Sequence, residues 1–139
     1  MQHWIDEAEE VLHLDLGGEL TAAPVIDWLQ ALMRDRPELR TWDWIIDARN
    51  LPADFGVDHV AHLSVAYRAS DAQVDGSGAV VALVTDDRYL HLWAQVMDFQ
   101  FPGRRHQTVP DMAAARDLIA HARVVREDEQ KTTSRSAEP

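Results

Sequence analysis

Six consecutive apolar residues, Ala79–Val84, constrain the fold of this chain more than any other segment. A strand with one face in water alternates apolar and polar residues, whereas a strand covered on both faces does not. The run is also much shorter than the roughly 20 apolar residues that a membrane-spanning helix needs. We therefore expect a buried strand at Ala79–Val84, in a sheet that carries helices on both faces.

The segments on either side of this run alternate between strand and helix patterns. Period-two alternation predicts strands at Leu12–Leu16 and Trp42–Asp47, and residues 3–7 are expected to pair with the first of them as an edge hairpin. Apolar spacings of three and four residues predict helices over about 22–36, 57–69, 86–101 and 111–122, and a short charged edge strand is expected at 104–109. The order β-β-α-β-α-β-α-β-α predicts an α/β fold with four helices packed on a five-stranded, mixed but mostly parallel sheet.

The length and charge of the chain restrict its organisation and its partners. With 139 residues, the chain is expected to form a single domain over residues 1–123, followed by a charged polar tail, 124–139. The net charge is -11, and the last sixteen residues hold only four of the 24 acids, so the acidity belongs to the folded part. Such a surface argues against nucleic acid as a partner. The absence of cysteine and of a signal-like N-terminus leads us to expect a cytoplasmic protein.

No motif indicates catalysis or a cofactor. The sequence has no G-x-S-x-G elbow, no dinucleotide fingerprint or P-loop, and no lysine before position 131 that would hold a phosphate. His59 and His62 lie one turn apart on a predicted helix, but two imidazoles make an incomplete zinc site, and solvated or capping histidines are the favoured interpretation. We therefore expect no enzymatic activity, no cofactor and no metal.

Three short motifs, in this order, carry a resemblance to a known family. They are Gly-Glu-Leu-Thr before the first helix, Ile45-Ile46-Asp47-Ala48-Arg49 at the end of a strand, and Val109-Pro110-Asp111 at the start of the last helix. Over residues 3–122 the chain resembles the SpoIIAA-like branch of STAS-type domains. The resemblance implies four helices on a mixed sheet and a role as an interaction module, of which the best known are anti-sigma-factor antagonists regulated by phosphorylation.

The chain departs from that family at the segment where the antagonists carry the phosphorylated Ser or Thr. The matching residues, 51–58, contain no hydroxyl, and Ser64 lies further along, on the apolar stripe of the next helix. We therefore expect the phosphorylation switch to be absent. Asp54 or Asp58 then has two interpretations, a permanent imitation of the phosphorylated state or, as we favour, an ordinary carboxylate at a helix start.

Two functional hypotheses follow. The leading one is a non-enzymatic regulatory module that binds another protein around the start of the second helix, through Asp54, Phe55, Asp58, His59 and His62. The alternative is a binding domain for a small apolar or lipid-like ligand with peripheral membrane contact, formed by Tyr89, Trp93, Met97, Phe99, Phe101, Arg104 and Arg105. Ordinary core packing of the aromatic residues and edge protection by the arginines are the competing structural explanations. An isologous homodimer is compatible with either function.

Overall fold

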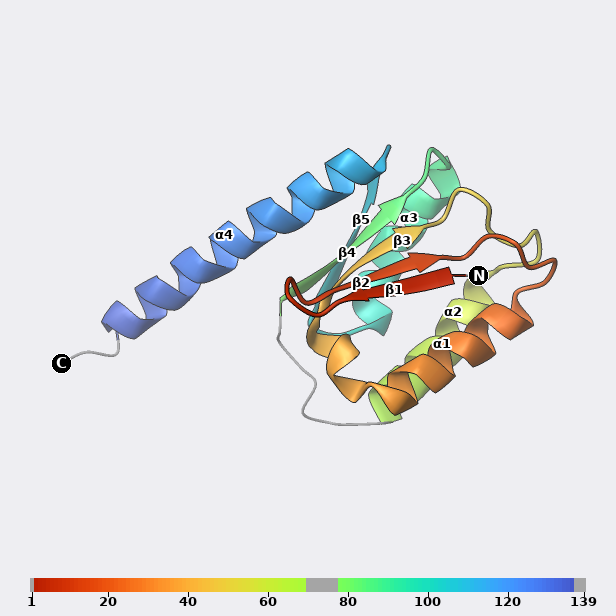
Figure 1. Cartoon of the computed structure of the whole chain (residues 1–139), viewed down its shortest axis with the longest axis horizontal. Coiled ribbons are helices and arrows are strands. Elements are labelled where there is room, and N and C mark those ends of the chain that lie inside the picture. Colours follow the sequence, from red (N-terminus) through yellow and green to blue (C-terminus); the bar gives the residue numbers. More distant parts are fainter. Residues whose placement is uncertain (1, 70–77, 137–139) are drawn as a thin grey trace.

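Five strands form one sheet in the order in which they occur along the chain (Figure 1). The computed structural model describes residues 2–69 and 78–136, and the side chains of residues 2–68 and 78–133. The strands are β1 (Gln2–Asp6), β2 (Val11–Asp15), β3 (Asp43–Asp47), β4 (Ala79–Val84) and β5 (Arg104–Val109). β1 runs antiparallel to β2, and the remaining neighbours are parallel. The predicted α/β class with its mostly parallel sheet is confirmed.

Helices cover both faces of this sheet, as the apolar run in β4 requires. The helices are α1 (Ala23–Asp35), α2 (Val57–Ala69), α3 (Arg88–Gln100) and α4 (Met112–Ser136), and a short 3-10 helix, η1 (Pro37–Thr41), leads from α1 into β3. α1, α2 and α3 pack on one face and α4 on the other (Figure 1). All six residues of β4 are buried because both faces of the strand meet helices.

The starts of the last two helices follow the expected capping chemistry. The Asp87 carboxylate accepts a hydrogen bond of 2.8 Å from the Tyr89 amide at the start of α3, and Asp111 accepts one of 2.8 Å from the Ala114 amide at the start of α4. Each satisfies an amide that has no partner within its own helix. The start of α1 differs from these, because its N-cap residue is Ala22, which has no capping side chain of its own.

α4 is longer than the sequence pattern predicts. The residues from 124 onward, expected to form a charged tail, continue as helix to Ser136, and Figure 1 shows this part of α4 projecting beyond the sheet. Their contact with the body does not stop at residue 123, because Arg126 reaches back to the start of β3. The division of the chain at residue 123 stays a prediction.

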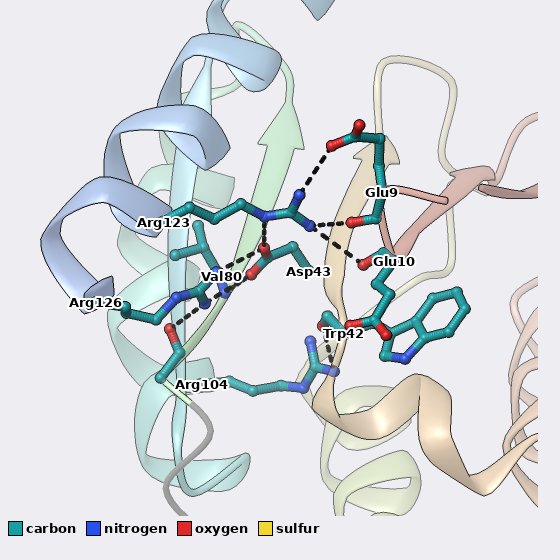
Figure 2. A network of polar contacts seen from close by, with 9 residues as sticks. Glu9, Glu10, Trp42, Asp43, Val80, Arg104, Arg123 and Arg126 are labelled. Atoms are coloured by element: carbon teal, nitrogen blue, oxygen red, sulfur yellow. Dashed lines mark hydrogen bonds and ion pairs between the residues drawn. The ribbon is translucent and has the colours of Figure 1, made fainter. Parts of the chain in front are cut away.

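A buried carboxylate at the start of β3 joins three elements (Figure 2). The side chain of Asp43 is 2% exposed and pairs with Arg123 and Arg126 of α4, at N–O distances of 2.9 Å in both cases. It also accepts a 2.8 Å hydrogen bond from the Val80 amide in β4. Arg126 further donates to the Gly78 carbonyl at 2.8 Å. α4 is thereby fixed to the ends of the two central strands.

The pKa of Asp43 reflects this environment. Burial alone would raise the pKa, but hydrogen bonds from Arg126, the Val80 amide and Arg123 outweigh burial and place the pKa below its ordinary value of 3.8. A carboxyl group with a lower pKa in the folded than in the unfolded state stabilises the fold at neutral pH. That contribution is lost as the pH falls from the unfolded-state value through the folded-state value.

Replacing Asp43 with Asn is therefore expected to lower the free energy of unfolding at pH 7 by about 3 kcal/mol, because it leaves two arginines without a buried counter-ion. The difference from the unchanged protein should shrink between pH 4 and pH 2, measured by denaturant unfolding across that range. Glu9 is a matched control, since its exposed carboxylate pairs with the same Arg123, so Glu9→Gln should cost less than about 0.5 kcal/mol. A gap between the unchanged protein and Asp43→Asn that is constant with pH would contradict this account.

Candidate functional site

A surface cleft lies where β3 and β4 end, at the carboxyl edge of the parallel strands. Its volume is about 720 Å³. This edge is where open α/β sheets most often place their ligands. The cleft is lined by the loop that follows β3 and by the start of α3, with Ala48, Arg49, Leu51, Pro52, Ala53, Phe55, Thr85, Asp86, Asp87, Tyr89, Leu90 and Trp93.

The cleft brings together residues that the sequence assigned to two different functions. Phe55, from the predicted partner-binding set, lines it together with Tyr89 and Trp93, from the predicted ligand-binding set. Asp58 and His62 do not line it, and both are exposed on α2. The cleft therefore contains one residue of the first predicted set and two of the second.

The charges around the cleft are mainly acidic. Asp86 and Asp87 line it, and its arginine, Arg49, is engaged by Asp47 through two hydrogen bonds of 2.9 and 2.7 Å. The hydrogen bond with Arg49 lowers the pKa of Asp47 from its ordinary value despite some burial, and it raises the pKa of Arg49. Because Asp47 neutralises Arg49, Asp86 and Asp87 determine the charge of the cleft, which is negative.

Asp54 holds α1 in place rather than α2. Its carboxylate accepts a 2.8 Å hydrogen bond from the amide of Ala22, the N-cap residue of α1. Gly56 precedes the first residue of α2 instead, and its amide donates to His59 Nδ1 at 3.1 Å. This bond is one half of a capping box, with a histidine in place of the usual glutamate, because Gly56 has no side chain to complete the reciprocal bond. Asp54 is thus a carboxylate at a helix start, but at that of α1 and not of the second helix, where the sequence placed it.

His59 is occupied locally. Besides its bond to the Gly56 amide, its ring stacks on Phe55, with centroids 5.9 Å apart. Within residues 2–68 and 78–133, no group of three His, Asp or Glu side chains is arranged to hold a metal ion. Because its ring stacks on Phe55, His59 fixes the position of Phe55 beside the cleft.

α3 exposes a second apolar face, which we call the α3 stripe and define as Tyr89, Leu92, Val96 and Phe99. Spacings of three, four and three residues place these side chains on one side of the helix. They lie opposite the buried Leu90, Ala94 and Met97. All four are exposed, Phe99 to 84%. Leu92 and Val96 were not predicted as site residues, although their spacing in the sequence indicates the stripe.

A hydrogen-bonded bridge holds the neighbouring helix beside the stripe. Arg68, near the end of α2, donates to the carbonyls of Phe99 and Gln100 at 3.0 Å each. These carbonyls have no partner further along α3, so the arginine caps its C-terminus. At the other end, Val57 of α2 meets Trp93 and Val96 of α3 in a shallow groove. The stripe and the start of α2 therefore form one continuous surface.

Arg104 and Arg105, from the predicted ligand-binding set, do not form a shared basic surface. Arg104 is 4% exposed, and its guanidinium donates from Nη2 to the carbonyls of Leu39 and Trp42, each at 2.9 Å, and to that of Arg40. It also lies over the ring of Trp44, 4.5 Å from the centroid. Arg105, in contrast, is exposed. Consecutive residues of a strand point to opposite faces, so the two arginines cannot share one surface.

His106, next in this strand, also points inward. Its side chain is 5% exposed and its Nδ1 lies 2.9 Å from an Asp98 carboxylate oxygen. Burial lowers the pKa of His106 below its usual value, and the hydrogen bond to Asp98 counters this only partly. No helix of the described residues is long and apolar enough to cross a membrane. Because the Arg104 side chain is buried, peripheral membrane contact through it is not supported.

Met97 and Phe101, from the predicted ligand-binding set, are buried. Both line an apolar cavity inside the core, whereas Tyr89 and Phe99 point to solvent. The predicted ligand-binding residues are thus divided between the interior and the surface.

Removal of the Asp54 carboxylate should destabilise the protein because it leaves the Ala22 amide without its partner. We expect Asp54→Ala to lower the free energy of unfolding by about 1 kcal/mol, and Asp54→Asn, which keeps an acceptor oxygen, to stay within about 0.5 kcal/mol of the unchanged protein. Chemical denaturation measures both. Asp58→Ala is the control on the neighbouring turn. An equal loss for Asp54→Asn and Asp54→Ala would show that the charge matters and the hydrogen bond does not.

Comparison with known proteins identifies the fold. No protein-family model and no curated protein sequence matches the chain. Among solved structures, it is similar to an uncharacterized protein of the DUF3478 family with a SpoIIAA-like fold, from Shewanella loihica. The two share 12% sequence identity and superimpose with a TM-score of 0.53 over 85% of this chain and 92% of the other. The chain therefore has a SpoIIAA-like fold, as its sequence motifs predict.

Proposed function

We propose that the chain is a non-enzymatic regulatory module of the STAS type that binds another protein. Its docking surface consists of the cleft and the α3 stripe, with Val57 of α2 at their border. The observation that supports this most strongly is the α3 stripe, because α3 buries one apolar face in the core and still presents a second one to solvent. A continuous exposed apolar face of this kind is typical of an interaction site.

The composition of the surface favours a protein partner. Interfaces are enriched in aromatic anchors that insert into pockets, with polar groups around them. Tyr89, Trp93 and Phe55 supply aromatic surface at the cleft, and Phe99 stands at the far end of the stripe. A helix or an extended segment of another protein, with apolar side chains along one face, would cover them.

The charges around the surface indicate which partner segment would fit. Asp86 and Asp87 line the cleft and Asp58 is exposed nearby on α2, while Arg49 is neutralised by Asp47. A segment with lysine or arginine beside its apolar residues complements this arrangement. A second copy of this chain fits less well, because an isologous contact would bring the same aspartates of two chains, each of net charge -11, toward one another.

We propose further that this surface works without phosphorylation at the start of α2. Residues 51–58 contain no hydroxyl side chain. Ser64, the next one along the chain, is 4% exposed and donates to the Ala61 carbonyl at 2.7 Å. A kinase would have to unfold the helix to reach it. Constitutive binding is therefore the simplest mode of action.

Replacing Val96 with Asp tests the docking surface. The tagged chain is used to isolate its partner from an extract of the source organism, and the partner is then purified and titrated against the chain. Val96→Asp should weaken binding at least about tenfold, because it places a carboxylate in an apolar contact beside other acids. Val124→Asp is the matched control, because the two valines have similar exposed fractions, 56% for Val124 and 46% for Val96. Val124 lies on α4, which packs on the opposite face of the sheet.

The Val124 variant should bind within about twofold of the unchanged chain, as is usual for a surface change away from an interface. Circular dichroism and the unfolding midpoint verify that both variants are folded. Equal weakening by both variants, or binding that Val96→Asp leaves intact, would contradict the proposed surface. Dimerisation of the chain through α3 in the absence of a partner, measured by light scattering, would also contradict the proposed surface.

A further inference from the structure

β1 is an edge strand without the features that normally keep an edge from pairing with another chain. It is the first strand in the spatial order of the sheet, so its outer side meets no other strand within the described residues. Proline, bulges and basic side chains protect natural edges, and β5, the opposite edge, carries the exposed Arg105. β1 has no proline, lysine or arginine, and it pairs with β2 residue for residue. Its outer side is therefore a template for one more strand.

A large aromatic side chain is exposed at the centre of this strand. Trp4 is 60% exposed, although its ring packs on His13 of β2 with centroids 4.5 Å apart. A groove of about 430 Å³ separates Trp4 from α4, which packs on β3, β4 and β5. Tryptophan is among the residues that most often anchor protein interfaces. The edge thus offers backbone hydrogen-bonding groups together with an apolar anchor.

The alternation of side chains restricts how a second copy of β1 can pair with the first. Two identical strands related by a two-fold axis through the sheet run antiparallel, and opposite residues then share one face. Only residues an even number of positions apart can therefore be opposite one another. Of these registers, the one centred on Trp4 alone pairs all five residues of both strands. It places Trp4 opposite its own copy, His3 opposite Ile5, and Gln2 opposite Asp6.

Charge permits this contact although each chain carries a net charge of -11. The Asp6 carboxylate faces the Gln2 side-chain amide, which can donate a hydrogen bond to it, and not a second carboxylate. The acidic turns, residues 7–10, lie at opposite ends of the paired strands, and a five-residue strand spans about 17 Å. That distance exceeds the Debye length of about 8 Å at physiological ionic strength. The β1 edge therefore avoids the facing carboxylates that disfavour a second copy at the cleft.

We propose that two copies of the chain join their β1 strands antiparallel, across a two-fold axis at Trp4, so that one sheet continues through both chains. The outer backbone groups of the two strands form the hydrogen bonds. The two tryptophans form a cross-strand pair, with Cβ atoms about 4.5–5.5 Å apart, between the two His13 rings. An interface of one short strand is small, so we expect a Kd of about 10–100 µM.

This dimer leaves the docking surface open. α3 packs against β5, at the edge of the sheet opposite to β1 (Figure 1). Two joined copies therefore carry one docking surface at each outer end. A partner with two binding sites gains avidity from such an arrangement. Only this consequence rests on the proposed function, because dimerisation itself is measured without a partner.

Analytical ultracentrifugation of the full chain, from about 5 to 500 µM, tests the dimer. The dimer fraction should rise with concentration, and about 0.5 M NaCl should increase it further by screening the like charges of the two chains. Trp4→Gln should weaken dimerisation at least about tenfold, because it removes the aromatic pair. Val124→Gln is the matched control, since Val124 is similarly exposed, at 56%, and it should stay within about twofold of the unchanged chain. The unfolding midpoint verifies that both variants are folded.

Single cysteines test the register, because the chain has no cysteine of its own. Gln2→Cys and Asp6→Cys are oxidised separately and as an equimolar mixture. In the proposed register the two thiols of the mixed pair are opposite one another, whereas two thiols at the same position lie about 14 Å apart along the strands. A disulfide needs Cα atoms within about 7 Å. The mixture should therefore form a linked dimer at least about tenfold faster than either variant alone.

Three results would overturn the proposal. The first is a chain that stays monomeric up to about 500 µM. The second is a dimer that Trp4→Gln leaves intact, and the third is equal cross-linking in the mixture and in the separate variants. Each of these would leave the docking surface on α3 untouched, because that surface is tested by the binding of a partner.

Discussion

The buried carboxylate of Asp43 is the interaction on which the arrangement of this domain depends. It bonds to the backbone of β4 and to two arginines of α4, so one side chain at the start of β3 links the two central strands with the helix on the far face. An unpaired carboxylate buried in this position would destabilise the fold, and an apolar residue would leave Arg123 and Arg126 without this counter-ion. With α4 held on that face, the other face of the sheet is left to α1, α2 and α3.

The three helices on that other face cover the core, and one of them, α3, also exposes an apolar stripe. α3 packs with Leu90, Ala94 and Met97 and is held at its end by Arg68 of α2. Its outer stripe is therefore displayed on a rigid support, which suits a docking surface because little ordering is required upon binding. The same packing leaves a small cavity beneath the helices, bordered by Arg104. The surface and the cavity share the walls formed by Phe55 and Leu90.

Much of the fold could be predicted from hydrophobic periodicity, because strand and helix patterns alternate without interruption and Ala79–Val84 requires cover on both faces. The candidate functional site was harder to predict from the sequence. Asp54 accepts a hydrogen bond from the amide of Ala22, 32 residues earlier, a contact for which no local pattern exists. Arg104 and Arg105 look alike in composition, yet strand alternation buries one and exposes the other. The α3 stripe is visible as a spacing, but only the structure shows that it faces away from the core.

Hydrogen–deuterium exchange of the chain, with and without its purified partner, tests the central claim most directly. Protection should appear in α3, from Arg88 to Gln100, and in the loop from 51 to 57 that forms the other wall of the cleft. α4 should exchange equally in both samples, because it lies on the opposite face of the sheet. Protection confined to α4 or to the β1 edge would show that the partner binds elsewhere and would contradict the docking surface.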